Sequence, residues 1–311
     1  MLHLRQLQCV IAIDESGSFQ RAADQLGITP SGLTQSVQRL EQRYGGSLFV
    51  RNRSGVTLTP MGEIVLEGAR AILQRSDSIE RELQLVNSPD QGELSIGVDP
   101  TLSNAVLGPA LSQVITEHPG LRFTVTSDNR RALADLLADR AIDLMVCYPQ
   151  RADTRDVLQS IPFTIPAPVV IGRAGHPLAQ QKNPTIDAFF TYPRLGAQLP
   201  DWYTDWASAE LSRLQQDIDP SAGYHLHSND IGLMKTIVQH SDALMGIHRR
   251  DAELELETGK VVEIRPKNWP QRVALEVVVS AERSLASMVE KLVLAITDAD
   301  PFTTAAAADG P

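Results

Sequence analysis

The 311-residue chain contains only two cysteines, Cys9 and Cys147. Two cysteines cannot build a disulfide framework or a metal cluster of thiolates. A free cysteine is most often a small buried hydrophobe, and nothing beside either residue indicates an exposed thiol with a lowered pKa. We therefore expect two buried, unreactive thiols, and we expect neither a bound metal nor a cofactor.

Long apolar runs are also lacking. No stretch approaches the roughly 18 apolar residues that a membrane-spanning helix needs. The first apolar run is broken by Arg5 and ends at Asp14 and Glu15, and it has no small-residue cleavage site, so it does not resemble a signal peptide. We expect a cytoplasmic protein without a membrane partner.

Positive charge is scarce as well, because the net charge at pH 7 is −10. Residues 1–65 carry six arginines and five acidic residues and are nearly neutral, so the rest of the chain is strongly acidic. Such a charge opposes non-specific attraction to nucleic acid. Any contact with phosphates must then come from the local placement of a few arginines.

The most informative segment is 19–41, which reads as two helices joined by a tight turn. Ser18 is a good N-cap for the first helix, and Gly27 is a typical C-terminal stop. Thr29 and Pro30 restart the chain as N-cap and first helical position. This pattern is typical of a helix-turn-helix, which reads DNA with its second helix.

The second of these helices has one apolar and one polar face. At about 100° per residue, one face carries Leu33, Val37, Leu40 and Tyr44, and the other carries Ser31, Thr34, Gln35, Gln38 and Gln42. These uncharged side chains hydrogen-bond as base edges in a major groove require, and glutamine suits adenine best. An ordinary solvated helix face is the alternative, and the spacing alone does not decide between them.

A β-hairpin is predicted directly after this helix. Gly45 and Gly46 end the helix, and two short apolar strands are expected at 48–50 and 56–59. The polar turn between them carries Arg51 and Arg53, which suit contacts to phosphates. A hairpin in this position makes the unit a winged helix-turn-helix.

The segment 18–62 resembles the winged helix-turn-helix of LysR-type transcriptional regulators. The matching residues are Ser18, Phe19, Ala22, Ala23, Leu26, Thr29, Thr34, Leu40, Glu41, Leu48, Phe49, Arg51, Leu58, Thr59 and Gly62. The resemblance implies binding of double-stranded promoter DNA through Thr29, Pro30, Ser31, Thr34, Gln35, Gln38, Arg51 and Arg53. Pro30 stands where the family often has a base-reading glutamine, so readout is expected to rest on Ser31, Thr34, Gln35 and Gln38.

A long helix is expected next, because no proline occurs from 62 to 87. Val65, Ile72, Ile79 and Val86 recur every seven residues, and Ala69, Ser76 and Leu83 follow the first three by four, as in a coiled-coil seam. A helix packed on its own domain is the alternative. The resemblance implies a linker helix that pairs two copies of the chain, with homotetramers and contact with RNA polymerase as further implications.

Strands and helices alternate in the C-terminal part, which predicts a parallel α/β sheet. Strands are expected at 93–98, 121–126, 142–147, 165–172 and 274–279, and helices at 105–116, 130–140, 231–240 and 285–296. This arrangement resembles the family's effector domain, which is similar to type 2 periplasmic binding proteins. Two α/β lobes, about 93–163 with 268–300 and about 164–267, are expected to enclose a small-molecule effector.

Ligands of such sheets lie beyond the carboxyl ends of the strands, often at helix N-termini. The candidate effector-binding residues are polar side chains at these positions, namely Thr101, Ser103, Asn129, Arg130, Tyr148, Gln198, His227, Ser228 and His248. Among them Arg130, His227 and His248 would suit a carboxylate. Each residue taken singly is more often a cap, turn or surface residue, and the cluster is a stronger signal than its members.

The sequence thus predicts a DNA-binding domain at 1–62, a linker helix at 63–88, a hinge at 89–92, an effector domain at 93–300 and a disordered tail at 301–311. The chain has no G-x-S-x-G, G-x-G-x-x-G or P-loop motif, and we expect no enzyme activity. The alternative is an enzyme or solute-binding protein with a helix-turn-helix fused at its N-terminus.

Overall fold

The computed structural model describes residues 2–52, 55–87, 91–151, 158–280 and 287–298, and it divides the chain into two compact units. The first unit comprises 1–83 with 139–141, and the second comprises the remainder. No helix in the described ranges is long and apolar enough to cross a membrane. The expected tail and most of the expected hinge lie outside the described residues.

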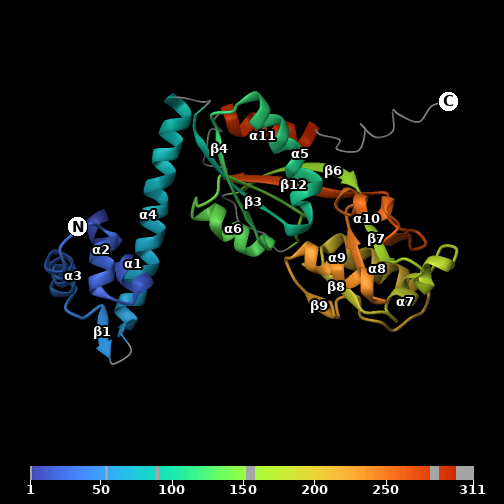
Figure 1. Ribbon diagram of the computed structural model, residues 1–311, viewed down its shortest axis with the longest axis horizontal. Coiled ribbons are helices and arrows are strands. Elements are labelled where there is room, and N and C mark those ends of the chain that lie inside the picture. Colours follow the sequence, from blue (N-terminus) through green and yellow to red (C-terminus); the bar gives the residue numbers. More distant parts are fainter. Residues whose placement is uncertain (1, 53–54, 88–90, 152–157, 281–286, 299–311) are drawn as a thin grey trace. The chain divides into compact units, whose positions relative to one another are not determined.

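The first unit holds three helices, a hairpin and a long helix (Figure 1), with the bounds α1 Leu4–Ser16, α2 Phe19–Gln25, α3 Pro30–Tyr44, β1 Phe49–Asn52, β2 Gly55–Leu58 and α4 Pro60–Asn87. The sequence-predicted caps are confirmed. Ser18 Oγ accepts a hydrogen bond from Arg21 N, and Thr29 Oγ1 accepts one from Gly32 N at 3.1 Å. Ala22 and Ala23 are fully buried, which lets neighbouring helices approach closely.

Several residues that match the regulator pattern hold this unit together. A Glu41 carboxylate oxygen accepts a hydrogen bond from Leu48 N at 2.8 Å and so fixes the entry to the hairpin. Thr59 Oγ1 accepts one from Gly62 N at 3.0 Å and caps α4. A Cβ atom at position 62 would lie 2.1 Å from the Leu48 carbonyl oxygen, so only glycine fits there. These residues match the pattern for reasons of folding.

The heptad seam of α4 divides into two parts. Val65 is half-buried and Ala69 is fully buried against the core of the first unit. Farther along, Ile72, Ile79 and Leu83 are 41%, 44% and 57% exposed. The alternative of a helix packed on its own domain therefore holds for the first part, and the second part presents an apolar stripe that is exposed among the described residues. The side chain of Val86 lies outside the description.

The second unit contains two five-stranded sheets. The first has the order β4-β3-β5-β12-β6 and is formed by β3 Glu93–Val98, β4 Arg122–Ser127, β5 Leu144–Cys147, β6 Leu158–Pro166 and β12 Arg272–Ser280. Its helices are α5 Gly108–Glu117, α6 Arg130–Ala138 and α11 Ser287–Asp298. Two short helical turns, Pro100–Leu102 and Ser103–Leu107, lead from β3 into α5. We call this part lobe 1.

Lobe 2 holds the other sheet, in the order β11-β7-β10-β8-β9. Its strands are β7 Val169–Arg173, β8 Arg194–Gly196, β9 Leu226–His227, β10 Leu244–Ile247 and β11 Val261–Ile264. Its helices are α7 Ile186–Phe189, α8 Asp201–Arg213, α9 Ile231–His240 and α10 Glu253–Glu257. The sequence predicted α9 with the same bounds, but it did not predict α8.

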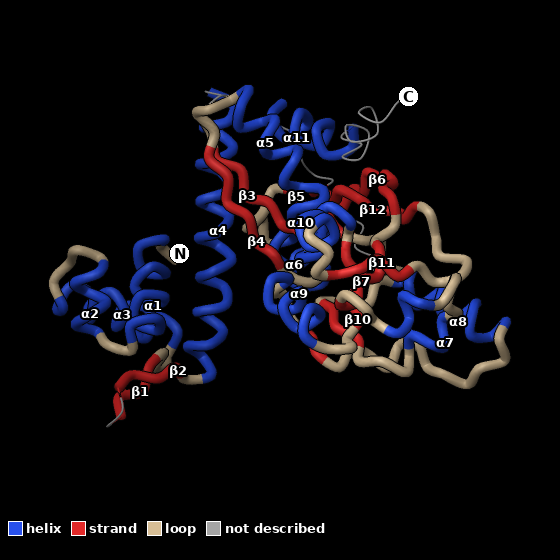
Figure 2. The backbone as a smooth tube through the Cα atoms, turned by 45° about the vertical axis from the view of Figure 1, so that its right-hand side comes forward, coloured by secondary structure: helices blue, strands red, loops and turns tan. Residues whose placement is uncertain are grey.

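The expectation of a wholly parallel sheet was wrong, because both sheets are mixed. In lobe 1, β3, β4 and β5 are parallel, while β12 runs antiparallel to both β5 and β6. Figure 2 shows β6 and β12 side by side, where the chain leaves lobe 1 and returns to it. The single strand expected at 165–172 is two strands, β6 and β7, which belong to different sheets.

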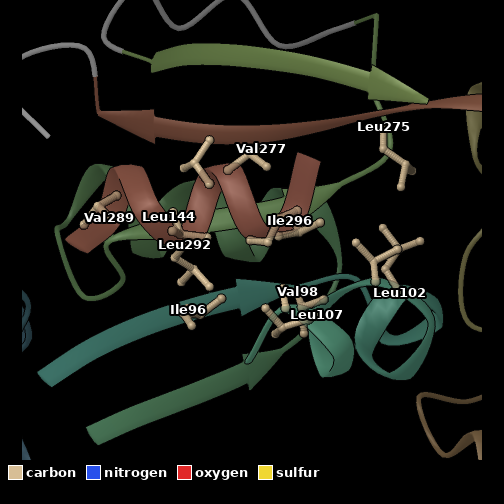
Figure 3. Packing of buried hydrophobic residues seen from close by; sticks show 14 of the residues in the cluster. Ile96, Val98, Leu102, Leu107, Leu144, Leu275, Val277, Val289, Leu292 and Ile296 are labelled. Atoms are coloured by element: carbon tan, nitrogen blue, oxygen red, sulfur yellow. The ribbon is translucent and has the colours of Figure 1, made fainter. Parts of the chain in front are cut away.

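The core of lobe 1 fixes where its strands end. Leu144 and Val146 of β5 face one apolar cluster, and Met145 and Cys147 face another, as the two-residue period of a strand requires. Val289, Leu292 and Ile296 of α11 pack in the first cluster with β3 and β12 (Figure 3). These layers hold Asp99 and Tyr148 just beyond the carboxyl ends of β3 and β5.

Candidate functional site

Helix α3 presents a polar face to solvent in the first unit. Pro30, Ser31, Gln35 and Gln38 are exposed, and Thr34 is half-buried. The Thr34 hydroxyl donates to the Pro30 carbonyl oxygen at 2.8 Å, and the Thr29 hydroxyl caps the helix. Two of the candidate hydroxyls therefore serve the helix itself. The amides of Gln35 and Gln38 make no hydrogen bond with the described residues, which leaves them available to a partner.

The hairpin lies after α3 as expected. Its strands pair antiparallel, with Arg51 opposite Val56 and Asn52 opposite Gly55. Arg51 is therefore in β1 rather than in the turn, one residue before the described strand ends. Arg53 lies outside the described residues.

A pocket in the second unit is lined by both lobes. It has a volume of about 90 Å³, which exceeds the roughly 30 Å³ that one water molecule occupies in the liquid. Lobe 1 contributes Asp99, Thr101, Arg130 and Tyr148, and lobe 2 contributes mainly Arg194, Gln198, Trp202, Tyr203, Tyr224, His248 and Trp269. We call it the aromatic pocket.

Aromatic side chains form a continuous wall of this pocket. The rings of Trp202 and Trp269 meet edge to face at 5.7 Å, and Tyr203 lies 6.0 Å from Trp202. A Cβ atom at Gly196 would lie 2.2 Å from the Tyr224 ring, so this glycine lets the ring lie directly against β8. Edge-to-face packing of large rings gives a rigid apolar surface for a ligand.

A hydrogen bond joins the lobes at the pocket. Tyr148 Oη and His248 Nε2 are 2.8 Å apart, and both residues are buried. Burial raises the pKa of Tyr148 well above its usual value and lowers the pKa of His248 to about 4, so both are neutral at pH 7. The other ring nitrogen of His248, Nδ1, is buried without a hydrogen-bond partner among the described residues.

Arg130, which we expected at a ligand carboxylate, is instead paired with a carboxylate of the chain. Its guanidinium forms a buried ion pair with Glu276 and donates to the Tyr148 carbonyl oxygen at 3.0 Å. Ser160 Oγ is also hydrogen-bonded to Glu276. The charge of Arg130 is thus balanced within lobe 1, at the edge of the pocket.

Both cysteines are buried and free. Cys147 Sγ lies 2.8 Å from a nitrogen of Arg130, but burial outweighs this cation and raises the pKa of the thiol to about 12. A thiol in that state is not a nucleophile at neutral pH. The described residues contain no group of three or more metal-ligating side chains.

The nine candidate effector residues fall into three groups. The first lines the aromatic pocket and comprises Thr101, Arg130, Tyr148, Gln198 and His248. The second lines a separate polar recess, which Asn129 and His227 share with Gln198. Ser103 and Ser228 line neither, and Ser228 Oγ accepts a hydrogen bond from Asp230 N as a turn residue.

Sequence reasoning missed the pocket residues of lobe 2, above all Arg194, Trp202, Tyr203 and Trp269. One feature of the sequence could have pointed to these residues, namely a local cluster of aromatic side chains. Aromatic residues make up only 5% of the chain, yet two of its three tryptophans and a tyrosine stand within five residues at 202–206.

The buried His248 predicts a pH-dependent stability. Its folded pKa of about 4 lies below its ordinary value of 6.5, so the unfolded chain binds the proton first as the pH falls. The folded state should therefore lose stability between pH 6.5 and pH 4, by up to about 3 kcal/mol. His248→Gln, whose amide can hydrogen-bond with Tyr148 in either direction but does not titrate, should lack this loss. Urea unfolding of both proteins over this pH range measures it.

The difference between the two proteins is the relevant quantity, because Asp251 titrates in the same range with the opposite sign. Burial raises the pKa of Asp251 to about 6. His227→Gln, at an exposed position, is the matched control and should follow the wild type. If the difference between wild type and His248→Gln does not change with pH, the burial of a neutral imidazole is wrong.

Two family models match the chain and together cover nearly all of it. Residues 4–63 match the bacterial regulatory helix-turn-helix protein of the lysR family, and residues 87–300 match the LysR substrate binding domain. The second match alone covers more than half of the chain.

Individual relatives agree with these matches. The "SDS degradation transcriptional activation protein" of Pseudomonas sp. (strain ATCC 19151) is 29% identical over 99% of this chain and 100% of its own length. A "probable hydrogen peroxide-inducible genes activator" of Mycobacterium avium is 30% identical over 61% of this chain and 60% of its own length.

The fold has solved counterparts. Full-length CbnR in complex with its target DNA has a TM-score of 0.72 over 95% of this chain and 99% of that chain, at 16% identity. The expected architecture of winged helix-turn-helix and two-lobed α/β domain is thereby confirmed. With a LysR helix-turn-helix, a LysR substrate-binding domain and relatives that are transcription regulators rather than enzymes, the chain belongs to the LysR family of bacterial transcription regulators.

Proposed function

We propose that this regulator reads a specific DNA sequence mainly with Gln35 and Gln38, under the control of a ligand bound in the aromatic pocket. The observation that carries the first part is the exposed, uncharged face of α3, whose two glutamine amides make no hydrogen bond with the described residues. Bidentate amides discriminate adenine in the major groove. Pro30 has no hydrogen-bonding side chain, so it contributes only to the start of the helix.

The remaining candidates hold the helix in register. Thr29 and Thr34 direct their hydroxyls to the backbone of α3, and Ser31 Oγ lies 3.2 Å from Thr29 Oγ1. Ser31 remains exposed and supplements the glutamines. Arg51 and Arg53 hold the flanking phosphates, which position a reading head without specifying sequence. Because the chain carries a net charge of −10, these few arginines supply a large share of its attraction to DNA.

The apolar stripe of α4 pairs two copies of the chain. Ile72, Ile79 and Leu83 lie on one face at heptad spacing and are exposed in the single chain. Pairing would bury them and place two α3 helices on successive half-sites of DNA. Tetramers, and contact with RNA polymerase, follow for this chain only from family resemblance. Such a regulator would act in the cytoplasm.

The effector binds in the aromatic pocket. It contacts both lobes there, and a ligand that binds one lobe angle better than another shifts the population of that angle. The angle would in turn change the spacing of the paired reading heads on DNA. The name of the Pseudomonas relative makes alkyl sulfates one class of ligand to test.

Removal of the Gln35 amide should relax sequence preference at one base pair of each half-site. We expect Gln35→Ala to lose about 1–3 kcal/mol of discrimination there and to keep its preference elsewhere. Selection of binding sites from a random-sequence DNA library, with wild type and variant side by side, measures this. Gln113→Ala, at an exposed position of α5, is the control. A uniform loss of affinity over all sequences would make Gln35 a backbone contact and sink the assignment.

Self-association should depend on the stripe. Ile79→Lys places a charge among apolar side chains that would be buried by pairing, so the chain should sediment as a smaller species in analytical ultracentrifugation. Glu67→Lys adds a lysine at an exposed position away from the stripe and should leave the mass unchanged. An Ile79→Lys protein with the mass of the wild type would contradict pairing through α4.

A further inference from the structure

Arg194 is the first residue of β8 and lies deep in lobe 2, where it is only 8% exposed. Its Nε and Nη1 atoms are buried and have no hydrogen-bond partner within the described part of the chain. No salt bridge of the described residues involves it. The side chain lines the aromatic pocket.

The neighbours of this guanidinium stabilise a cation without neutralising it. Its central carbon stands 4.1 Å from the centre of the Phe190 ring, a cation–π geometry. Tyr203 interacts with it, yet burial raises the pKa of Tyr203, so this hydroxyl stays uncharged. A cation buried among neutral groups costs free energy until an anion joins it.

The rest of the pocket limits what that anion can be. Its walls near Arg194 are apolar and aromatic, with Phe189, Trp202 and Trp269 among them. A carboxylate, Asp99, lies at the lobe 1 end of the pocket, where it is bonded to Thr101. An anionic ligand group is thus repelled from lobe 1 and attracted to lobe 2. A volume of about 90 Å³ suits one ring or a short alkyl chain rather than a nucleotide.

We infer that Arg194 anchors the effector, and that the effector is a small amphiphile with one anionic group, a carboxylate or a sulfate, on an apolar ring or short chain. This inference rests on the proposed function, because it takes the aromatic pocket as the effector site. The anionic group pairs with the guanidinium of Arg194, whose planar donors suit two oxygens of one group. The apolar body lies against the rings of Trp202 and Trp269.

The tryptophans themselves report binding. Two of the three tryptophans of the chain line the pocket, and Trp206 contacts Trp269 at 4.7 Å, so intrinsic fluorescence follows occupancy directly. Benzoate, hexanoate, hexyl sulfate and the uncharged benzyl alcohol are titrated into the full-length protein. We expect at least one of the three anions to bind more tightly than benzyl alcohol. The comparison of hexanoate with hexyl sulfate decides between the two anionic groups.

Arg194→Met should then weaken the binding of that anion about 10- to 100-fold and leave benzyl alcohol within a few-fold of wild type. It should also raise the thermal unfolding midpoint of the ligand-free protein, because an unpaired buried charge is replaced by an apolar side chain. Arg194→Lys keeps the charge without the fork and should bind the anion with intermediate affinity. Arg265→Met, at an exposed arginine of the same lobe, should change neither quantity.

Five outcomes would overturn the inference. A Met variant that binds the anion as tightly as wild type would remove Arg194 from the site, and so would a Lys variant of undiminished affinity. A Met variant that unfolds more easily than wild type would make Arg194 a structural residue. Binding of benzyl alcohol without any anion would refute the ligand class and leave the pocket as the effector site, whereas binding of none of the four compounds would refute both.

Discussion

A buried cation without a counter-ion costs folding free energy, and lobe 2 is built around one. Arg194 begins a three-residue strand whose neighbours are aromatic rings and neutral hydroxyls rather than carboxylates. The contrast lies in lobe 1, where Arg130 is paired with Glu276 and its charge is balanced. Arg194 is thus the buried arginine that we propose pairs with a ligand. The aromatic pocket combines this cation with apolar walls, and its carboxylates Asp99 and Asp201 accept hydrogen bonds from Thr101 and Arg151 N.

We propose that the pocket controls DNA reading because polar groups of both lobes meet at it, among them Arg151 N, which donates to Asp201 at 2.9 Å. Tyr148 and His248 form one bond between the lobes, and the His248 ring keeps a second nitrogen without a partner among the described residues. The hydrogen bond between Tyr148 and His248 stabilises one arrangement of the lobes. A ligand that bonds to the second nitrogen of His248 would favour a different arrangement. The thiols offer no comparable switch. Both cysteines are buried, and burial raises the pKa of Cys147 to about 12.

The sequence predicted correctly those features that residues adjacent in the chain determine. The caps Ser18 and Thr29, the start at Pro30 and the bounds of α9 are local, and they were found from spacing and residue type. The heptad seam of α4 was predicted, but not what covers each part of it. A heptad pattern does not tell whether Ala69 faces its own domain or another chain. The mixed sheets were missed because β12 returns to lobe 1 more than a hundred residues after β5. The pocket was missed for the same reason, since Tyr148, Trp202 and Trp269 meet only in the folded chain. The boundaries of the domains and the roles of the site residues remain proposals.

The central claim is that occupation of the aromatic pocket and binding of DNA by α3 are coupled. Coupling between two sites is reciprocal, so DNA must change the affinity for the effector by the same factor as the effector changes the affinity for DNA. The direct measurement is a tryptophan-fluorescence titration of the anion that binds in an Arg194-dependent manner, with and without saturating DNA selected by the wild-type protein. We expect the dissociation constant of the anion to differ by about 5-fold or more between the titrations with and without DNA. Equal dissociation constants would contradict it, because the pocket would then bind its ligand without informing the reading head.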